Sequence, residues 1–337
     1  MLQTRAAAGL HYAGAENLNA LLDECQGHVL GIVAFGKPGP CFPDVPFSAV
    51  DMPVLGNDTC YEVWTGTAPV QIARHGGIHS AHDPHLLFGC MAIPDDAHAD
   101  YAALIYQNYC RIFDHLDAEG FPKLLRIWHY LPDIHRNAQQ FERYQQFSLG
   151  RHQAFVAKGR TIRTDAPAAS AVGKHSGNTI ISFLAAPHAG TPVENPRQVS
   201  AYAYPAQYGP RGPTFSRALF TAPHGKAQLY ISGTAAILGH ASQHEGNVEA
   251  QTDETIANLR AVLNEARTLG LIDGPACDMA LTFKVYVRQP EYRSIVLRRL
   301  REAFGEESSI LFLHADICRR ELLLEIEAVC SSRTRMS

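Results

Sequence analysis

The chain lacks the features that mark membrane, secreted and nucleic-acid-binding proteins. It has no run of eighteen apolar residues, so the sequence predicts no membrane-spanning helix. The first residues, Met-Leu-Gln-Thr-Arg-Ala-Ala-Ala-Gly, lack the apolar core of a secretory signal. The formal net charge of −4 gives no electrostatic footprint for nucleic acid. These absences favour a cytoplasmic protein with neither a membrane nor a nucleic-acid partner.

Paired cysteines are also missing. The eight cysteines are scattered along the chain, and none forms a Cys-x-x-Cys pair. A chain of 337 residues can build a core without disulfides, so free thiols in a reducing compartment are the simplest interpretation. The content of 46% hydrophobic and 18% charged residues is typical of a soluble globular protein, with either two ordinary domains or one large domain.

What the sequence does contain is an internal repeat. Residues 86–93 (LLFGCMAI) align with residues 230–237 (YISGTAAI), and residues 126–132 (RIWHYLP) align with residues 284–290 (KVYVRQP). In each copy, the two segments enclose a stretch in which apolar residues recur at three- and four-residue spacing, which predicts a helix. Asp95 or Asp96 is expected to cap the first of these helices, and Asn247 the second.

After the shared proline, each copy predicts one more helix and a closing strand. The helices are expected over residues 139–155 and 291–304, and the strands over residues 179–186 and 322–329. The Pro- and Gly-rich residues 187–196 between the copies predict a linker. The expected division is therefore 1–190 and 191–337.

The opening region is less regular than the rest. Residues 29–35 form a short, branched apolar run that predicts a buried strand. The Pro-rich residues 36–53 that follow predict a loop.

The closing strand carries two acids, Glu325 and Glu327, among apolar neighbours. A carboxylate is costly to bury unless it is paired or neutral, and a carboxyl group held neutral can donate a proton near neutral pH. The alternative is a strand with one wet face, because the acids alternate with Leu324, Ile326 and Ala328.

Several segments in the second copy resemble the RidA (YjgF) family, namely residues 213–218 (PTFSRA), 229–235 (LYISGTA), 284–287 (KVYV) and 324–328 (LEIEA). The first copy resembles a degenerate second unit of the same type. A tandem of this kind is similar to the chorismatases, which the segments 126–134, 142–151 and 198–211 also resemble.

The resemblance implies a fold and an activity. The expected fold is α+β, with two tandem RidA/YjgF-like (chorismate-mutase-like) units whose mixed sheets have helices packed on one face. The expected units are a degenerate one over 1–190 and one over 191–337 that carries the catalytic acid. Chorismatases split chorismate into pyruvate and either a dihydroxycyclohexadiene carboxylate or a hydroxybenzoate, and no metal or organic cofactor is implied. RidA proteins are trimers with sites at subunit junctions. A monomer or a homo-oligomer, including a trimer, is therefore expected here, with the site between or beside the two halves.

By resemblance, Glu325 matches the family's acid, and the first copy has Ser182 at the aligned position. Chorismate has an enol ether, which stays inert until its methylene carbon is protonated by a positioned acid. Glu327 is the competing candidate.

Chorismate also carries two carboxylates, which call for guanidinium groups. Arg151, Arg217 and Arg288 lie in family-like motifs, although each could equally form an ordinary surface ion pair. Tyr202 and Tyr208 could orient a ring hydroxyl or a water, or could be core residues with satisfied hydroxyls.

Two small residues resemble product-determining positions. Cys318, seven residues before the acid, resembles the branch that makes hydroxybenzoate, while a cysteine in an apolar segment is otherwise packing. Ala235 is the second position, with Ala236 as the alternative alignment. Together they resemble the bifunctional members that release 3- and 4-hydroxybenzoate.

Other functions stay open at this point. A chorismate hydrolase that makes the diol differs only in its product. A RidA-type imine deaminase is disfavoured because Ile310 stands where that family carries an arginine. Residues 74–85 hold four histidines, a pattern that suggests a metal-binding module, but Gly76, Gly77 and Pro84 favour a polar loop. A non-catalytic small-molecule-binding protein or scaffold is disfavoured by the candidate acid and the arginines.

Overall fold

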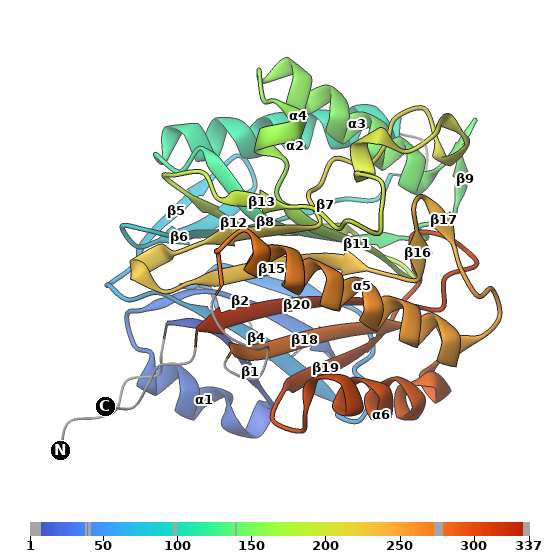
Figure 1. Ribbon diagram of the computed structural model, residues 1–337. Coiled ribbons are helices and arrows are strands. Elements are labelled where there is room, and N and C mark those ends of the chain that lie inside the picture. Colours follow the sequence, from blue (N-terminus) through green and yellow to red (C-terminus); the bar gives the residue numbers. More distant parts are fainter. Residues whose placement is uncertain are drawn as a thin grey trace.

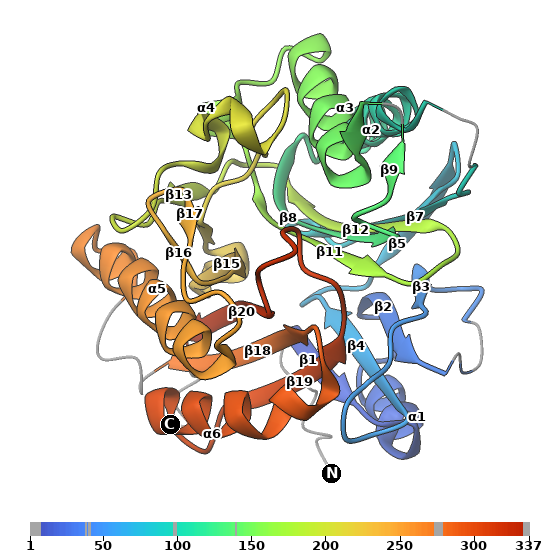
Figure 2. The same cartoon turned by 90° about the vertical axis from the view of Figure 1, so that its right-hand side faces the viewer.

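Three β-sheets pack around one centre, and each carries its helices on the outside (Figure 1, Figure 2). The computed structural model describes residues 8–37, 39, 42–96, 100–138, 140–272 and 279–332. Within these ranges, no helix is long and apolar enough to cross a membrane. We call the sheets and their helices unit 1 (residues 9–65), unit 2 (71–186) and unit 3 (191–332).

Units 2 and 3 share one topology. The first sheet has the order β5-β6-β7-β12-β8-β11, and the second has the order β13-β14-β15-β20-β18-β19. In both, the last strand named is parallel to its neighbour and the central pairs are antiparallel. The strands of unit 2 are β5 (Gln71–His75), β6 (Ile78–His82), β7 (Leu87–Ile93), β8 (Lys123–Pro132), β11 (Ala168–Lys174) and β12 (Thr179–Ala186). Those of unit 3 are β13 (Thr191–Val193), β14 (Ala218–Thr221), β15 (Gln228–Thr234), β18 (Met279–Val287), β19 (Ser309–His314) and β20 (Leu324–Ser332).

The strand register agrees with the repeat. Ser182 pairs with Trp128 in unit 2, and Glu325 pairs with Tyr286 in unit 3. Because residues 126–132 align with residues 284–290 in the sequence, Trp128 and Tyr286 are equivalent, and so are Ser182 and Glu325. The α+β fold with two tandem units and mixed sheets is therefore confirmed.

Two long helices cover the outer face of each of these sheets. They are α2 (Tyr101–Ala118) and α3 (Arg143–Ala157) in unit 2, and α5 (Val248–Thr268) and α6 (Arg293–Phe304) in unit 3. Asn247 caps α5 through the Ala250 N–H at 3.0 Å, as predicted. The cap of α2 is Asp100, which accepts from the Ala103 N–H, and not Asp95 or Asp96. Asp95 precedes the helix by several residues and instead pairs with Arg143 at 2.9 Å.

Unit 1 was not predicted as a separate sheet. It consists of β1 (Gly9–Ala13), α1 (Ala15–Glu24), β2 (Val29–Gly36), β3 (Phe47–Val50) and β4 (Thr59–Thr65). Its order, β1-β4-β2-β3, repeats the order β15-β20-β18-β19 of unit 3, with the last pair parallel in both. Unit 1 is thus a shortened version of the same topology, and part of the expected loop over residues 36–53 is the strand β3.

The three sheets turn their inner faces toward one another, and a shared core fills the centre. Trp64 of unit 1 packs against Trp128 of unit 2 and Tyr230 of unit 3, with ring centroids 5.4 and 6.3 Å apart. Separate apolar clusters lie between each sheet and its own helices. Burial in the shared core thus joins the three units.

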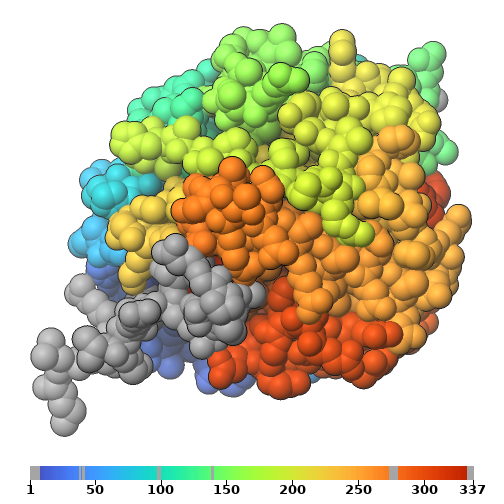
Figure 3. All heavy atoms as spheres, viewed as in Figure 1, coloured from blue at the N-terminus to red at the C-terminus, as the bar shows by residue number. Residues whose placement is uncertain are grey.

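The expected linker is not a free connection. Residues 191–193 form the edge strand β13, which pairs with β14, and Val193 is buried. Downstream, Asn195 and Arg197 hydrogen-bond to Asn258 on α5. In the space-filling view this yellow-green segment lies against the orange helix α5 (Figure 3). The pairing of backbone groups and buried apolar contacts explain why a Pro-rich stretch is ordered here.

The histidine-rich stretch is a β-hairpin and not a loop. The strands β5 and β6 pair across a turn at Gly76 and Gly77, both of which have positive φ. His75 and His79, which are four residues apart in the sequence, therefore lie on opposite strands and not on one face of a helix. Among the described residues, no group of three or more potential ligands could hold a metal ion.

The remaining elements are short. In the described part of the chain they are β9 (Asn137–Ala138), β10 (Phe141–Glu142), β16 (Ile237–Leu238), β17 (Ala241–Ser242), α4 (Ile162–Asp165) and the 3₁₀ turns Ala201–Ala203, Ala206–Tyr208, Pro223–Gly225 and Pro290–Tyr292. The described cysteines, at 25, 60, 90, 110, 318 and 330, are free thiols. Cys41 and Cys277 lie outside the described residues.

Candidate active site

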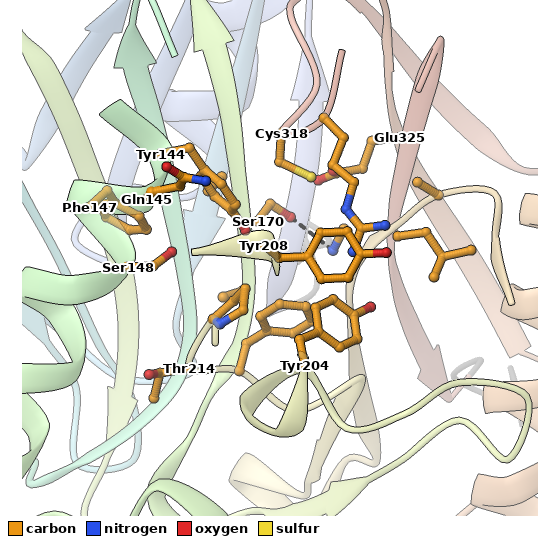
Figure 4. Close-up of a pocket in the computed structure, with 18 of the residues that line it drawn as sticks. Tyr144, Gln145, Phe147, Ser148, Ser170, Tyr204, Tyr208, Thr214, Cys318 and Glu325 are labelled. Carbon is orange, nitrogen blue, oxygen red and sulfur yellow. Dashed lines mark hydrogen bonds between the residues drawn. The ribbon is translucent and has the colours of Figure 1, made fainter. Parts of the chain in front are cut away.

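A cavity of about 360 Å³ lies at the junction of units 2 and 3. Unit 2 contributes α3 and β11, and unit 3 contributes β15, β20 and the segment before β14. Its lining includes Tyr144, Gln145, Phe147, Ser148, Arg151, Ser170, Tyr204, Tyr208, Thr214, Phe215, Arg217, Gly233, Ala235, Cys318, Arg319 and Glu325 (Figure 4). The size, the mixed lining and the charges suit a small anionic molecule.

Glu325 points into this cavity from β20 (Figure 4). Its side chain is 5% exposed. Burial raises the pKa of Glu325 to about 8, and the negative charge of Glu327 adds to this effect, while Arg126 opposes it. A carboxyl group with such a pKa is mostly protonated at pH 7 and can act as an acid.

The backbone of β15 gives Glu325 its room. A Cβ built on Gly233 would lie 1.9 Å from the Glu325 Oε1 atom. A residue with a side chain could not occupy position 233 unless the acid moved. The glycine of the Ser-Gly-Thr motif is therefore required by close approach to the acid, and its φ is not positive.

Glu327 lies two residues away on the same strand face but has another environment. Its carboxylate is 3.2 Å from the Lys284 Nζ and 2.7 Å from the Arg126 Nη2. It also accepts from the Trp128 Nε1 at 2.7 Å and from the Tyr286 hydroxyl at 3.1 Å. Burial alone would raise the pKa of Glu327, but Lys284 and Arg126 outweigh burial and lower it. Glu327 is thus an ionised structural group.

Ser170 links Glu327 to the backbone of Gly233, the glycine that lies against Glu325, and was not predicted. Its hydroxyl donates to Glu327 Oε2 at 2.5 Å and accepts from Arg126 Nη2 at 2.5 Å and from the Gly233 N–H at 3.1 Å. No motif points to it, because Ala168–Lys174 consists mostly of small residues. Its role follows only from the packing of β11 against β15.

Cys318 lies beside Glu325, with its sulfur toward the acid (Figure 4). Burial raises the pKa of the Cys318 thiol to about 12, and the nearby Glu325 adds to this effect. The thiol is therefore neutral at physiological pH and is not a thiolate nucleophile.

Two of the three predicted arginines reach the cavity. Arg151 on α3 is 3% exposed, and its Nε and Nη2 have no hydrogen-bond partner in the described part of the chain. Arg217 donates through Nη2 to the Val199 carbonyl at 2.7 Å and to the Tyr204 hydroxyl at 2.8 Å, which leaves its Nε unpaired. Buried, unpaired guanidinium donors are suited to binding an anion.

Arg288 lies elsewhere. Its guanidinium pairs with Asp316 and donates to the carbonyls of Leu322 and Arg319, each at 3.0 Å. It therefore holds the loop between β19 and β20 in place, and its donors are occupied by that loop. The structure assigns it a place behind the cavity, not in its lining.

Tyrosines at the mouth are placed by the 3₁₀ turns over residues 201–208. Tyr204 and Tyr208 line the cavity, whereas Tyr202 lies in a neighbouring depression with Arg211. Tyr204 lies between the two hollows and lines both, whereas Tyr202 lines only the neighbouring depression. Tyr204 was missed because a run of three tyrosines within seven residues carries no signal for which one faces inward.

Arg319 was also missed, although it directly follows Cys318 in the sequence. Its guanidinium lies 3.8 Å from the centre of the Tyr208 ring, and its Nη1 donates to the His240 carbonyl at 2.9 Å. With Arg320, which also lines the cavity, it brings the arginines of the lining to four. Of the two alanines, Ala235 lines the cavity, while Ala236 is buried in the shared core.

Comparisons with known proteins identify the family. The model of the FkbO/Hyg5-like chorismatase N-terminal region matches residues 62–185. A chorismatase from Streptomyces rapamycinicus is 36% identical over 324 residues, which cover 94% of this chain and 93% of that protein. The chain belongs to the chorismatase family. It is an enzyme of that class.

Two further relatives agree with this assignment. A 3-hydroxybenzoate synthase from Streptomyces hygroscopicus is 34% identical over 276 residues, 80% of each chain. A crystal structure of a chorismatase superposes with a TM-score of 0.85 at 30% identity and covers 97% of this chain and 99% of that one. The family member of known structure thus extends over all three units described above.

Proposed function

We propose that this enzyme converts chorismate into pyruvate and 3-hydroxybenzoate, 4-hydroxybenzoate or both. The observation that carries the proposal is a buried carboxyl group, Glu325, whose pKa is raised to about 8 inside a cavity lined by arginines. Relatives at this similarity include a 3-hydroxybenzoate synthase. An enol ether needs a positioned acid that is still protonated near neutral pH, and the two carboxylates of chorismate need cationic partners.

In the proposed mechanism, Glu325 protonates the methylene carbon of the enol ether. The ether oxygen on the side chain then becomes part of the leaving group, and pyruvate departs. The ring hydroxyl assists this expulsion through an arene-oxide-like species that loses a ring proton and becomes aromatic. Chorismate has the combined composition of pyruvate and one hydroxybenzoate, so this route consumes neither water nor a cofactor.

Arg151, Arg217 and Arg319 are proposed to bind the substrate carboxylates. Their guanidinium groups come from opposite sides of the cavity, from α3, from the segment before β14 and from the loop before β20. Arg151 has the most unpaired donors of the three and is buried, so we assign it a bidentate carboxylate contact.

The test is product analysis after incubation with chorismate. Wild-type protein is expected to release pyruvate and a hydroxybenzoate. Glu325→Gln keeps the shape but removes the proton, and its turnover is expected to fall by about 10²–10⁴-fold. Near-normal turnover by this variant would contradict the role of Glu325.

Cys318 and Ala235 are proposed to determine the product. Cys318→Ala keeps the neutral, buried character of the position but removes the sulfur beside the acid. We expect a changed ratio of 3- to 4-hydroxybenzoate by chromatography, and an unchanged ratio would remove Cys318 from the product choice. The matched variant Cys330→Ala removes a buried thiol on the same strand as Glu325 but outside the cavity, and is expected to leave the ratio unchanged.

The second candidate is hydrolysis of chorismate to the dihydroxycyclohexadiene carboxylate. It would use the same acid but needs a water, and the unpaired hydroxyl of Thr214 in the cavity wall could hold one. Incubation in ¹⁸O-water separates the two reactions, because only hydrolysis requires a solvent oxygen. The oligomeric state, the cytoplasmic location and the division at residue 190 stay predictions.

A further inference from the structure

The centre of the molecule holds a buried set of charges that joins all three units. Glu62 comes from unit 1, Arg126 from unit 2, and Lys284 and Glu327 from unit 3, and each is at most 5% exposed. Lys284 Nζ lies 2.5 Å from Glu62 Oε2 and 3.2 Å from Glu327 Oε1. One ammonium group is therefore shared by two carboxylates.

We propose that Glu62 is a positioning residue for the reaction. Because Glu62 pairs with Lys284, Lys284 compensates the charge of Glu327 only in part, and the remaining negative charge of Glu327 keeps Glu325 protonated. This inference rests on the proposed function of Glu325 as the acid. It assigns a part in the chemistry to unit 1, whose described residues contribute no side chain to the cavity lining.

The charge balance gives the direction of the effect. In the set itself, two carboxylates face two cations, so it is neutral when Glu325 is protonated. Ionisation of Glu325 would add an uncompensated negative charge to a buried region, which is costly. If Glu62 loses its charge, the set becomes positive, and an ionised Glu325 would restore neutrality.

The other groups that face these residues do not compete over the relevant pH range. The Cys318 thiol and the Tyr144 hydroxyl lie near Glu325, the Tyr286 hydroxyl donates to Glu327, and burial raises the pKa of each. The Tyr12 and Tyr130 hydroxyls lie near Lys284, and burial raises their pKa values as well. Burial alone would lower the pKa of Lys284, but Glu327 and Glu62 outweigh burial and raise it.

The set has its own optical reporters. The chain has two tryptophans. Trp64 Nε1 donates to Glu62 at 2.8 Å, and Trp128 Nε1 donates to Glu327 at 2.7 Å. Tryptophan emission can therefore follow the charge state around Glu325 without any substrate.

The experiment compares wild type with Glu62→Gln and Glu327→Gln. Glutamine retains an oxygen that can accept from the tryptophan in each case, and Lys284 keeps one carboxylate partner. The wild-type emission is expected to titrate near pH 8 and to lose this transition in Glu325→Gln. In both charge-removing variants, the transition and the alkaline limb of kcat/KM with chorismate are expected to move to lower pH by about one unit or more. Glu62→Asp keeps the negative charge, so its transition is expected to lie close to that of the wild type.

The matched control is Glu249→Gln, which removes one carboxylate of a surface ion-pair group on α5. Its pH profile is expected to match that of the wild type. The inference is overturned if Glu62→Gln leaves the emission transition in place or moves it to higher pH, or if wild type shows no transition that depends on Glu325. Because the titration needs no chorismate, a failure of the proposed activity would leave this result readable on its own.

Discussion

At the scale of single residues, Glu325 and Glu327 show how neighbours decide the chemistry of one side-chain type. Both lie on the same face of β20 and are equally buried. Glu327 faces Lys284 and Arg126 and is ionised, whereas Glu325 faces a cavity, a thiol and a glycine. The difference in charge state comes from these partners and not from burial as such.

The pH dependence of stability tests this difference without substrate. Folding raises the pKa of Glu325 from 4.5 to about 8, so the folded protein holds a proton that the unfolded chain releases. This stabilisation is complete below pH 4.5 and is lost as the pH rises through 8. Relative to wild type, Glu325→Gln is therefore expected to be more resistant to urea at pH 9 than at pH 5. An equal difference at both pH values, measured by urea unfolding, would contradict the raised pKa.

The proposed acid role of Glu325 also predicts how the activity depends on pH. In the proposed mechanism Glu325 must be protonated to act, so kcat/KM is expected to decline as the pH rises through about 8. A pH–rate profile between pH 5 and 10 checks this. Activity that increases above pH 8 would point to a different catalytic group.

Gly233 offers a steric test at the same site. A methyl group at this position would overlap the Glu325 carboxyl, so Gly233→Ala should displace the acid and reduce turnover by about 10²-fold. The thermal unfolding midpoint serves as the control for folding. Normal turnover in a folded Gly233→Ala protein would show that the reaction does not depend on the present position of the Glu325 carboxyl group.

At the scale of elements, the loop between β19 and β20 depends on Arg288, the residue directly after β18. Arg288 holds three backbone carbonyls of this loop, including that of Arg319. The contacts of Arg288 in this structure are therefore those of a residue that holds a loop, and not those of a residue that binds substrate.

Arg288→Met is expected to loosen this loop. Hydrogen exchange should increase over residues 316–323, and turnover should fall while the rest of the molecule keeps its protection. The matched variant Arg293→Met removes a guanidinium on α6 that donates to the Leu55 carbonyl and does not line the cavity, so it should spare the loop. Unchanged hydrogen exchange over residues 316–323 in Arg288→Met would contradict the role of Arg288 in holding this loop.

Long elements with a clear apolar period could be predicted from the sequence, and Thr179–Ala186 agrees with its strand residue for residue. The strands β11 and β13 could not, because small residues and prolines predict loops and only pairing with neighbours makes them strands. For the cavity, motifs located Glu325, Cys318, Arg151 and Arg217. Ser170, Tyr204 and Arg319 depend on how separate segments pack, which no single segment encodes.

At the scale of the whole molecule, the shared core determines how the three units hold together. Lys284 is the cation between units 1 and 3, and its removal would leave two buried carboxylates with one remaining cation. Lys284→Met is expected to destabilise the protein by about 3–5 kcal/mol. Adding Glu62→Gln to this variant removes one of the uncompensated charges and should recover part of the loss. Additive effects in urea unfolding would contradict the coupling.

The common topology of the three units has a consequence for how such a site can change. In a ring of identical subunits, every mutation appears at each junction at once. A buried acid that serves catalysis at one junction would therefore also be buried at all the others. Here the equivalents of the acid position can differ, with Ser182 in unit 2 and Glu325 in unit 3. A single continuous chain can therefore devote one junction to chemistry while its other contacts are free to become framework.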